Sequence, residues 1–130
     1  MARDINIWVS GSLARDYIMD FPGRFVDYIA PDKIHALSLS FAVRSLQQNF
    51  GGTAANIAYS LVQLREHPEV LGNIGMKDRE FRSYLRRLHI GTRYLQKSTR
   101  GHTAAAYIIT DRNDNQITGF YPGAMKEARK

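Results

Sequence analysis

The chain has 130 residues and a mass of 14.8 kDa, which suits one domain or part of one. With 44% hydrophobic and 23% charged residues it has the composition of a globular protein, and the absence of cysteine excludes a disulfide scaffold, a zinc ribbon and a thiol nucleophile. No run approaches the roughly 20 apolar residues of a membrane helix, and Met1-Ala2-Arg3-Asp4 does not lead into a signal peptide. A soluble cytoplasmic protein is therefore expected.

The formal net charge of +6 is concentrated in the second half, where residues 66–130 hold twelve of the eighteen basic side chains. Within it, a helix with its apolar residues turned inward would expose Arg79, Arg82, Arg86 and Arg87 to water. Such a solvated face explains the charge without a ligand. No aromatic residues alternate with these cations as in a base-stacking surface, so binding of nucleic acid is the less favoured interpretation.

Hydrophobic spacing predicts the elements in chain order. Residues 5–9 and 37–43 alternate apolar and polar side chains and predict two strands, the first ending in a turn at Ser10-Gly11-Ser12. Residues 54–65 carry an apolar stripe at helical spacing that cannot continue past Pro68. The remaining predicted elements are a strand at 70–75, a helix that Asp78 caps and that stops at Gly91, and a hairpin of strands 103–110 and 116–121 around the polar loop 111–115.

The order strand, helix, strand, helix favours a parallel sheet with crossover helices. The hairpin after it adds an antiparallel accessory sheet. We therefore expect an α/β fold with a small second sheet.

A pair of glycines, Gly51-Gly52, lies just before the predicted helix at 54–65, and Asn56 follows in its first turn. Glycines allow a ligand to approach the backbone, and the first amides of a helix have no partners within it. Sugar hydroxyls or a phosphate would suit such a site. Plain turn geometry explains the glycines equally well, and neither a P-loop nor a G-x-G-x-x-G pattern is present.

Asp16 lies just past the turn that ends the first strand. Ligands of open α/β sheets bind beyond the carboxyl ends of the strands, and a carboxylate there can accept hydrogen bonds from two vicinal hydroxyls. The alternative is a loop aspartate that caps a nearby turn. The four histidines show no metal-ligand spacing, and no serine has a Ser-His-Asp context, so neither a metal nor a catalytic residue is predicted.

Five segments together resemble the amino-terminal portion of a ribokinase/PfkB-family kinase, nearest to its bacterial adenosine-kinase branch. In chain order they are Gly11-Ser12-x-x-x-Asp16, Phe21-Pro22-Gly23-Arg24-Phe25, Ser38-Leu39-Ser40-Phe41, Gly51-Gly52-Thr53-Ala54-Ala55-Asn56-Ile57-Ala58 and Gln116-Ile117-Thr118-Gly119-Phe120-Tyr121-Pro122-Gly123-Ala124-Met125.

The resemblance implies a partial ribokinase-like (Rossmann-like) fold with a β lid, its strands near 37–49 and 103–121. The family transfers the γ-phosphoryl group of ATP to a primary hydroxyl of a sugar or nucleoside. By resemblance, Asp16, Gly52 and Asn56 would hold the ribose hydroxyls. The other implied pocket residues are Gly51 beside them, Ser12 and Ser40 in its lining, and Phe120, which would stack on a purine.

Two substitutions depart from the family pattern. Ala106 stands where the adenosine-kinase branch carries a second aromatic residue, which argues against adenosine as the acceptor. Tyr107 is adjacent, but strand alternation would turn it to the other face. Ala14 replaces an amide residue of ribose kinases, which argues against plain ribose.

Length is the larger departure, since family members are more than twice as long. Their Gly-Ala-Gly-Asp turn with the catalytic base, and the residues for ATP and Mg²⁺, lie in a carboxy-terminal half that residues 1–130 do not resemble. We therefore expect the acceptor-binding and lid portion of a kinase, inactive alone, which either forms a homodimer through the lid or pairs with a carboxy-terminal half. The alternative is a non-catalytic ligand-binding or oligomerisation module derived from the kinase fold.

Overall fold

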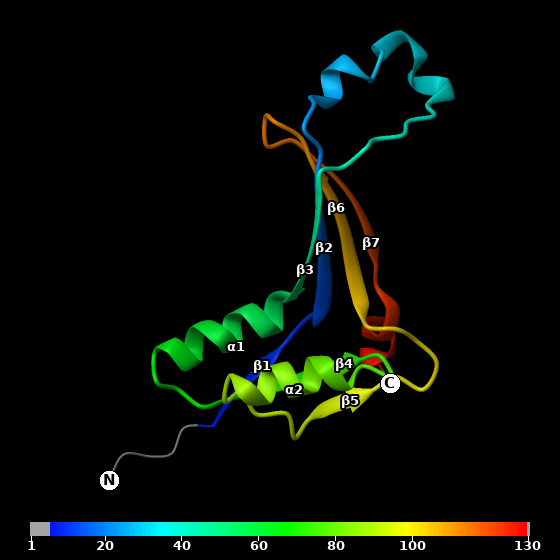
Figure 1. Ribbon diagram of the computed structural model, residues 1–130. Coiled ribbons are helices and arrows are strands. Elements are labelled where there is room, and N and C mark those ends of the chain that lie inside the picture. Colours follow the sequence, from blue (N-terminus) through cyan, green and yellow to red (C-terminus); the bar gives the residue numbers. More distant parts are fainter. Residues whose placement is uncertain (1–5, 130) are drawn as a thin grey trace. The chain divides into compact units, whose positions relative to one another are not determined.

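The computed structural model describes residues 6–129 (Figure 1). Its strands and helices, in chain order, are β1 (Ile7–Ser10), β2 (Ala14–Asp20), β3 (Ser45–Gly51), α1 (Thr53–Gln63), β4 (Pro68–Ile74), α2 (Arg79–Arg87), β5 (Leu95–Lys97), β6 (Ala104–Thr110) and β7 (Gln116–Tyr121). Short 3₁₀ helices are η1 (Phe25–Asp27), η2 (Pro31–Ala36) and η3 (Gly123–Arg129).

The first sheet has the strand order β1-β4-β5, and both pairings are parallel. Val9 lies opposite Val70, and Gly72 lies opposite Leu95. Because α1 precedes β4 and α2 precedes β5, the predicted parallel sheet with crossover helices is confirmed. The first residue of the strand predicted at 5–9, Ile5, lies outside the described residues. The short strand β5 was not predicted from the sequence.

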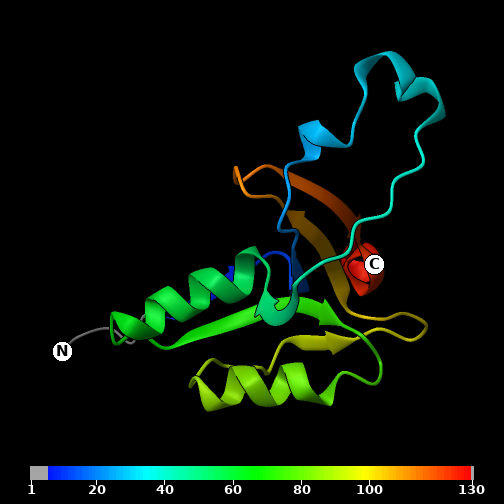
Figure 2. The same cartoon turned by 45° about the horizontal axis from the view of Figure 1, so that its top comes forward.

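Both helices pack on one face of this sheet, and β4 runs between them in the view of Figure 2. Alternate side chains of β4, Val70 and Ile74, point to this face and are fully buried. Small alanines on α1 let it approach closely, while α2 contributes Phe81 and Leu85. The other members of this core are Val9, Leu13, Ala54, Ala55, Ala58, Ile90 and Leu95.

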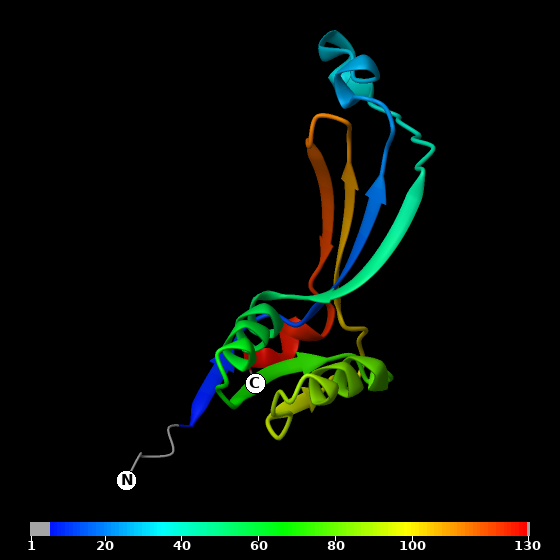
Figure 3. The ribbon, with the colours of Figure 1, turned by 60° about the vertical axis from the view of Figure 1, so that its left-hand side comes forward.

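The second sheet has the order β3-β2-β6-β7 (Figure 3). Strands β6 and β7 form the hairpin that the β-prone runs on either side of the polar loop predicted. Strand β2 begins directly after the first turn and was not predicted, since its sequence ARDYIMD lacks a clear alternation.

The prediction of a strand over residues 37–43 is wrong, because this segment has no regular structure and β3 begins only at Ser45. An aromatic residue of this segment packs against other aromatic side chains. The ring of Phe41 packs in an aromatic cluster with Phe21, Phe25 and Tyr28, with centroids 4.7–5.9 Å apart. Alternating side chains produce a strand only where a neighbouring strand satisfies the backbone, and here the cluster holds the segment instead.

The predicted end of the second helix at Gly91 is also wrong. Helix α2 ends at Arg87, and His89 takes the left-handed conformation with φ of 58°. Gly91 has a different reason to be glycine, because a Cβ there would lie 2.5 Å from the carboxylate oxygens of Glu69.

Only part of the arginine face of α2 is solvated as expected. The guanidinium of Arg82 donates to the carbonyl oxygens of Thr92, at 3.1 Å, and Leu95, at 2.7 Å. Arg86 donates to the Thr92 hydroxyl at 3.3 Å, while Arg79 and Arg87 are exposed. Part of the positive charge therefore binds the segment that leads into β5.

The chain divides into two units. The core unit comprises the chain up to Arg15, Phe50–Ala105 and the chain from Tyr121 onward, and the strand unit comprises Asp16–Asn49 and Ala106–Phe120. The parallel sheet and both helices belong to the core unit. Most of the second sheet belongs to the strand unit.

Candidate functional site

Gly52 has φ of 93° and ψ of 150°, a conformation that only glycine adopts without strain. A Cβ on this residue would overlap the Ser12 carbonyl group and lie 2.8 Å from Ala14 N. The glycine therefore lets the start of α1 lie directly against the turn between β1 and β2.

Ser12 caps α1 from that turn. Thr53 N donates to Ser12 Oγ at 2.8 Å, and Ala54 N donates to Ser12 O at 3.0 Å. The expectation that the first helical amides point to a ligand is therefore wrong for these two. The side chain of Asn56, in the first turn of α1, is exposed.

Asp16 is half-buried on β2, and burial raises the pKa of its carboxyl group. Its neighbour Tyr17 stacks on Tyr107 of β6, with ring centroids 4.9 Å apart. Because successive residues of a strand point to opposite faces, Asp16 and Ala106 share the other face of the sheet. Tyr107 thus lies away from Ala106, as the sequence predicted.

The seven predicted pocket residues fall in both units. Ser12, Gly51, Gly52 and Asn56 belong to the core unit, whereas Asp16, Ser40 and Phe120 belong to the strand unit. Ser12 and Gly52 are in direct contact, Gly51 is buried at the end of β3, and Ser40 and Phe120 are exposed. A shared pocket with Asp16 stays a prediction.

The sequence analysis missed a polar network in the core unit, although it correctly predicted Asp78 as a helix cap. The Arg15 guanidinium donates to both Asp78 carboxylate oxygens, at 2.5 and 3.1 Å, and to Glu80 at 3.1 Å. Asp78 also accepts hydrogen bonds from Phe81 N, at 3.0 Å, and from the Thr103 hydroxyl. No local signal could find these partners, because Arg15 and Asp78 are 63 residues apart.

The network sets the charge state of its members. The hydrogen bond to Asp78 raises the pKa of Arg15. Burial alone would raise the pKa of Asp78, but the donors of Arg15, Thr103 and Phe81 hold it below its ordinary value. Asp78 is therefore a carboxylate at neutral pH.

A separate cavity of about 400 Å³ lies in the core unit. Its lining is Ser10, Leu71, Gly72, Asn73, Arg93, Tyr94 and Gln96, none of which is a predicted pocket residue. Leu71 and Asn73 alternate with Val70 on β4, so this cavity lies on the sheet face away from the helices.

Two observations concern the metal and the phosphate groups that the resemblance implies. Among residues 6–129, no group of three or more His, Asp or Glu side chains could hold a metal ion. The amides of Thr53 and Ala54, which could have bound a phosphate, are bonded to Ser12. In the same part of the chain, no helix is long and apolar enough to cross a membrane.

Residues 22–130 match the pfkB family of carbohydrate kinases. The chain belongs to this family. Its ribokinase-like α/β fold agrees with solved members. The nucleoside kinase of Burkholderia thailandensis in complex with inosine superposes on 94% of this chain with a TM-score of 0.82 and 36% sequence identity. The nucleoside kinase of Methanocaldococcus jannaschii superposes on 94% of this chain with a TM-score of 0.77 and 31% sequence identity.

Two curated relatives are nucleoside kinases. That of M. jannaschii is 31% identical over 122 residues, and that of Methanothermobacter thermautotrophicus is 26% identical over 128 residues. The chain spans only 37% and 38% of their lengths. A structure of the Burkholderia enzyme in complex with ADP-inosine, at a TM-score of 0.73, covers 94% of this chain.

Proposed function

We propose that the chain is the acceptor-binding and lid portion of a pfkB-family nucleoside kinase. The similarity that carries this proposal is to the inosine complex of the Burkholderia nucleoside kinase, at 36% identity over 94% of the chain. Two further nucleoside kinases among the curated relatives support it. The acceptor is a nucleoside or related sugar whose primary hydroxyl receives the phosphoryl group of ATP.

In this proposal Asp16 accepts hydrogen bonds from the two ribose hydroxyls. A carboxylate binds vicinal hydroxyls by charge-assisted hydrogen bonds, which are stronger than neutral ones. Gly52 allows the backbone to approach the sugar, Gly51 lies beside it, and Asn56 offers a donor and an acceptor from the first turn of α1.

Ser12, Ser40 and Phe120 complete the proposed pocket. The structure qualifies the role of Ser12, whose hydroxyl already accepts from Thr53 N. Ser12 therefore acts on the sugar mainly by holding the Gly52 turn. Phe120, exposed on β7, offers its ring for stacking on a base.

Alone, the 130-residue chain is proposed to be inactive as a kinase. Phosphoryl transfer requires groups that stabilise the moving phosphoryl group and position the acceptor. The amides of Thr53 and Ala54 are already bonded to Ser12, and residues 6–129 hold no group of three or more His, Asp or Glu side chains for a metal ion. Incubation with ATP, Mg²⁺ and inosine should give no nucleoside monophosphate, and measurable turnover would contradict this part of the proposal.

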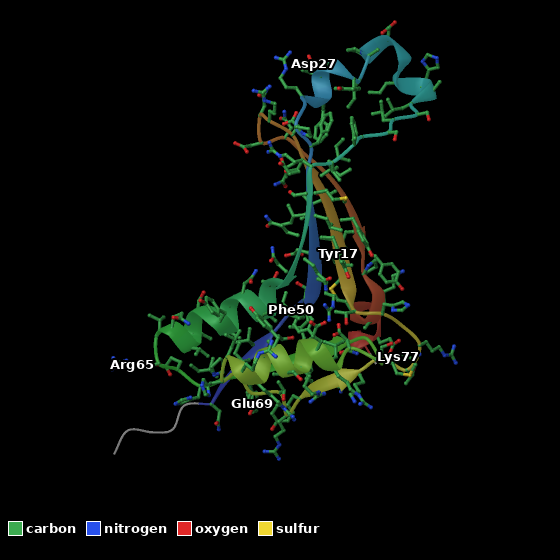
Figure 4. The ribbon with its side chains drawn as sticks, viewed as in Figure 1. Tyr17, Asp27, Phe50, Arg65, Glu69 and Lys77 are labelled. Carbon is green, nitrogen blue, oxygen red and sulfur yellow. The ribbon has the colours of Figure 1, made fainter. Side chains whose placement is uncertain are left out.

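Calorimetry with inosine, adenosine and ribose tests the binding proposal. We expect weak binding of a nucleoside that Asp16→Ala abolishes, because the two hydroxyls lose their charged acceptor. Asp27→Ala is the matched control, since Asp27 is an exposed carboxylate of η1 paired with Arg24 and should leave binding unchanged (Figure 4). Equal binding by wild type and Asp16→Ala would show that Asp16 does not hold the acceptor.

A further inference from the structure

The chain passes between the two units at four places, after Arg15, before Phe50, after Ala105 and before Tyr121. Three of these places lie beside one set of core-unit side chains. Arg15 and Phe50 are themselves the core-unit residues at two crossings, and Thr103 lies two residues before Ala105. The contacts of these residues within the core unit therefore hold the backbone near these three places.

Arg15 is held on three sides within the core unit. Its guanidinium chelates Asp78, pairs with Glu80, and lies 4.8 Å above the centre of the Phe50 ring. Phe50, labelled in Figure 4, stacks in turn on Tyr84 of α2, with centroids 4.3 Å apart. Only 12% of the Arg15 side chain is exposed, so the arginine cannot change partners without leaving a buried charge unpaired.

Asp78 is the centre of this arrangement and is 9% exposed. Its carboxylate accepts from Arg15, from the Thr103 hydroxyl and from Phe81 N at the start of α2. Thr103 accepts in turn from Gly75 N at 2.8 Å. One carboxylate thus connects the start of α2 to Arg15, near the start of β2, and to Thr103, the residue before β6.

We propose that Asp78 is a positioning residue for acceptor binding, which fixes the backbone of Asp16 by clamping Arg15. This inference rests on the proposed function. Asp16 follows Arg15 directly, and consecutive Cα atoms are about 3.8 Å apart, so a shift of the Arg15 backbone also displaces Asp16. Hydrogen bonds to a diol lose strength over a few tenths of an ångström, so a loosened Arg15 weakens the acceptor site without any contact between Asp78 and the ligand.

Asp78→Asn and Arg15→Gln test this inference. Asparagine keeps the helix cap but removes the negative charge that pairs with the Arg15 guanidinium. We expect each single variant to bind inosine about tenfold more weakly than the wild type. The double variant should bind inosine no more weakly than the more affected single variant, because both substitutions remove the same contact. Glu80→Gln is the matched control, since its carboxylate is 69% exposed, and it should change the affinity less than about twofold.

Amide hydrogen exchange at Asp16 and Tyr17 provides a readout that needs no ligand. Faster exchange in Asp78→Asn and Arg15→Gln than in wild type and Glu80→Gln supports the clamp, even if the wild-type chain binds no nucleoside and the proposed function fails. Unchanged exchange at these amides, or losses of affinity that add in the double variant, would overturn it. Arg15→Gln leaves the cap of α2 intact and carries the test if Asp78→Asn does not fold.

Discussion

At the scale of single residues, the structure explains why position 52 is a glycine. The sequence left open whether the two glycines cradle a ligand or only form a turn. The structure shows that the first group a side chain at Gly52 would meet is the protein's own Ser12 carbonyl. Ser12, once only a candidate for the pocket lining, is also the cap of α1.

Replacing Gly52 with alanine should therefore destabilise the chain even without ligand. The positive φ and the overlap with Ser12 together predict a loss of about 2–3 kcal/mol in the free energy of unfolding. Urea denaturation followed by circular dichroism measures it. Gly119→Ala is the control, because a Cβ at Gly119 meets nothing within 4 Å, and a comparable loss in both variants would contradict the packing argument.

At the scale of elements, the turn between β6 and β7 is organised by one carboxylate. Asp111 is buried and accepts hydrogen bonds from the backbone amides of Phe25, Asn113 and Asn115. It therefore joins the hairpin to η1 within the strand unit. Burial alone would raise the pKa of Asp111, but these donors lower it to about 2.

Acid should consequently loosen this part of the strand unit. Since the folded-state pKa of Asp111 is below the ordinary 3.8, its stabilising effect is complete above about pH 4 and is lost as the pH falls through about 2. The NMR shifts of the Phe25 and Asn113 amides should titrate with this midpoint. Because the lowered pKa of Asp78 also affects global stability in acid, these local probes are needed.

Two variants of the turn complete that experiment. Asp111→Asn should abolish the titration of both amides. Asp114→Asn is the matched control in the same turn, where asparagine tolerates the φ of 59°, and it should leave the titration unchanged. A midpoint near 4 in the wild type would contradict the hydrogen-bonding account.

At the scale of the whole molecule, two aromatic side chains are exposed on the face of the parallel sheet that lies opposite α1 and α2. Trp8, 63% exposed, alternates with the core residue Val9 and makes an edge-to-face contact with Tyr94, which is 41% exposed. Such exposed apolar surface favours association. We propose that the chain pairs with a further copy of itself, through the lid or through this face.

Light scattering should therefore give a mass above 14.8 kDa that rises with concentration. Trp8→Ser should lower the mass if the sheet face takes part. Leu64→Ser is the control, since Leu64 is 72% exposed at the end of α1, away from this face, and should have no effect. A 14.8 kDa monomer at all concentrations would contradict the association.

The family, the parallel sheet, the two helices, the hairpin and the Asp78 cap were all predicted from sequence, because each depends on local periodicity, on turn residues or on motifs that the chain itself carries. Residues 37–43 and the end of α2 were predicted wrongly. There, an aromatic cluster and the conformation of His89 overrode the local pattern.

Only the tertiary structure showed that Ser12 caps α1, that Arg82 binds the segment before β5, and that Arg15 meets Asp78. These contacts join residues far apart in the chain, and their geometry depends on how the strands and helices pack. Periodicity reports which face of an element is apolar, but it carries no information on which polar groups meet after packing. Packing decides which polar groups meet, because a buried donor or charge that lacks a partner destabilises the folded state.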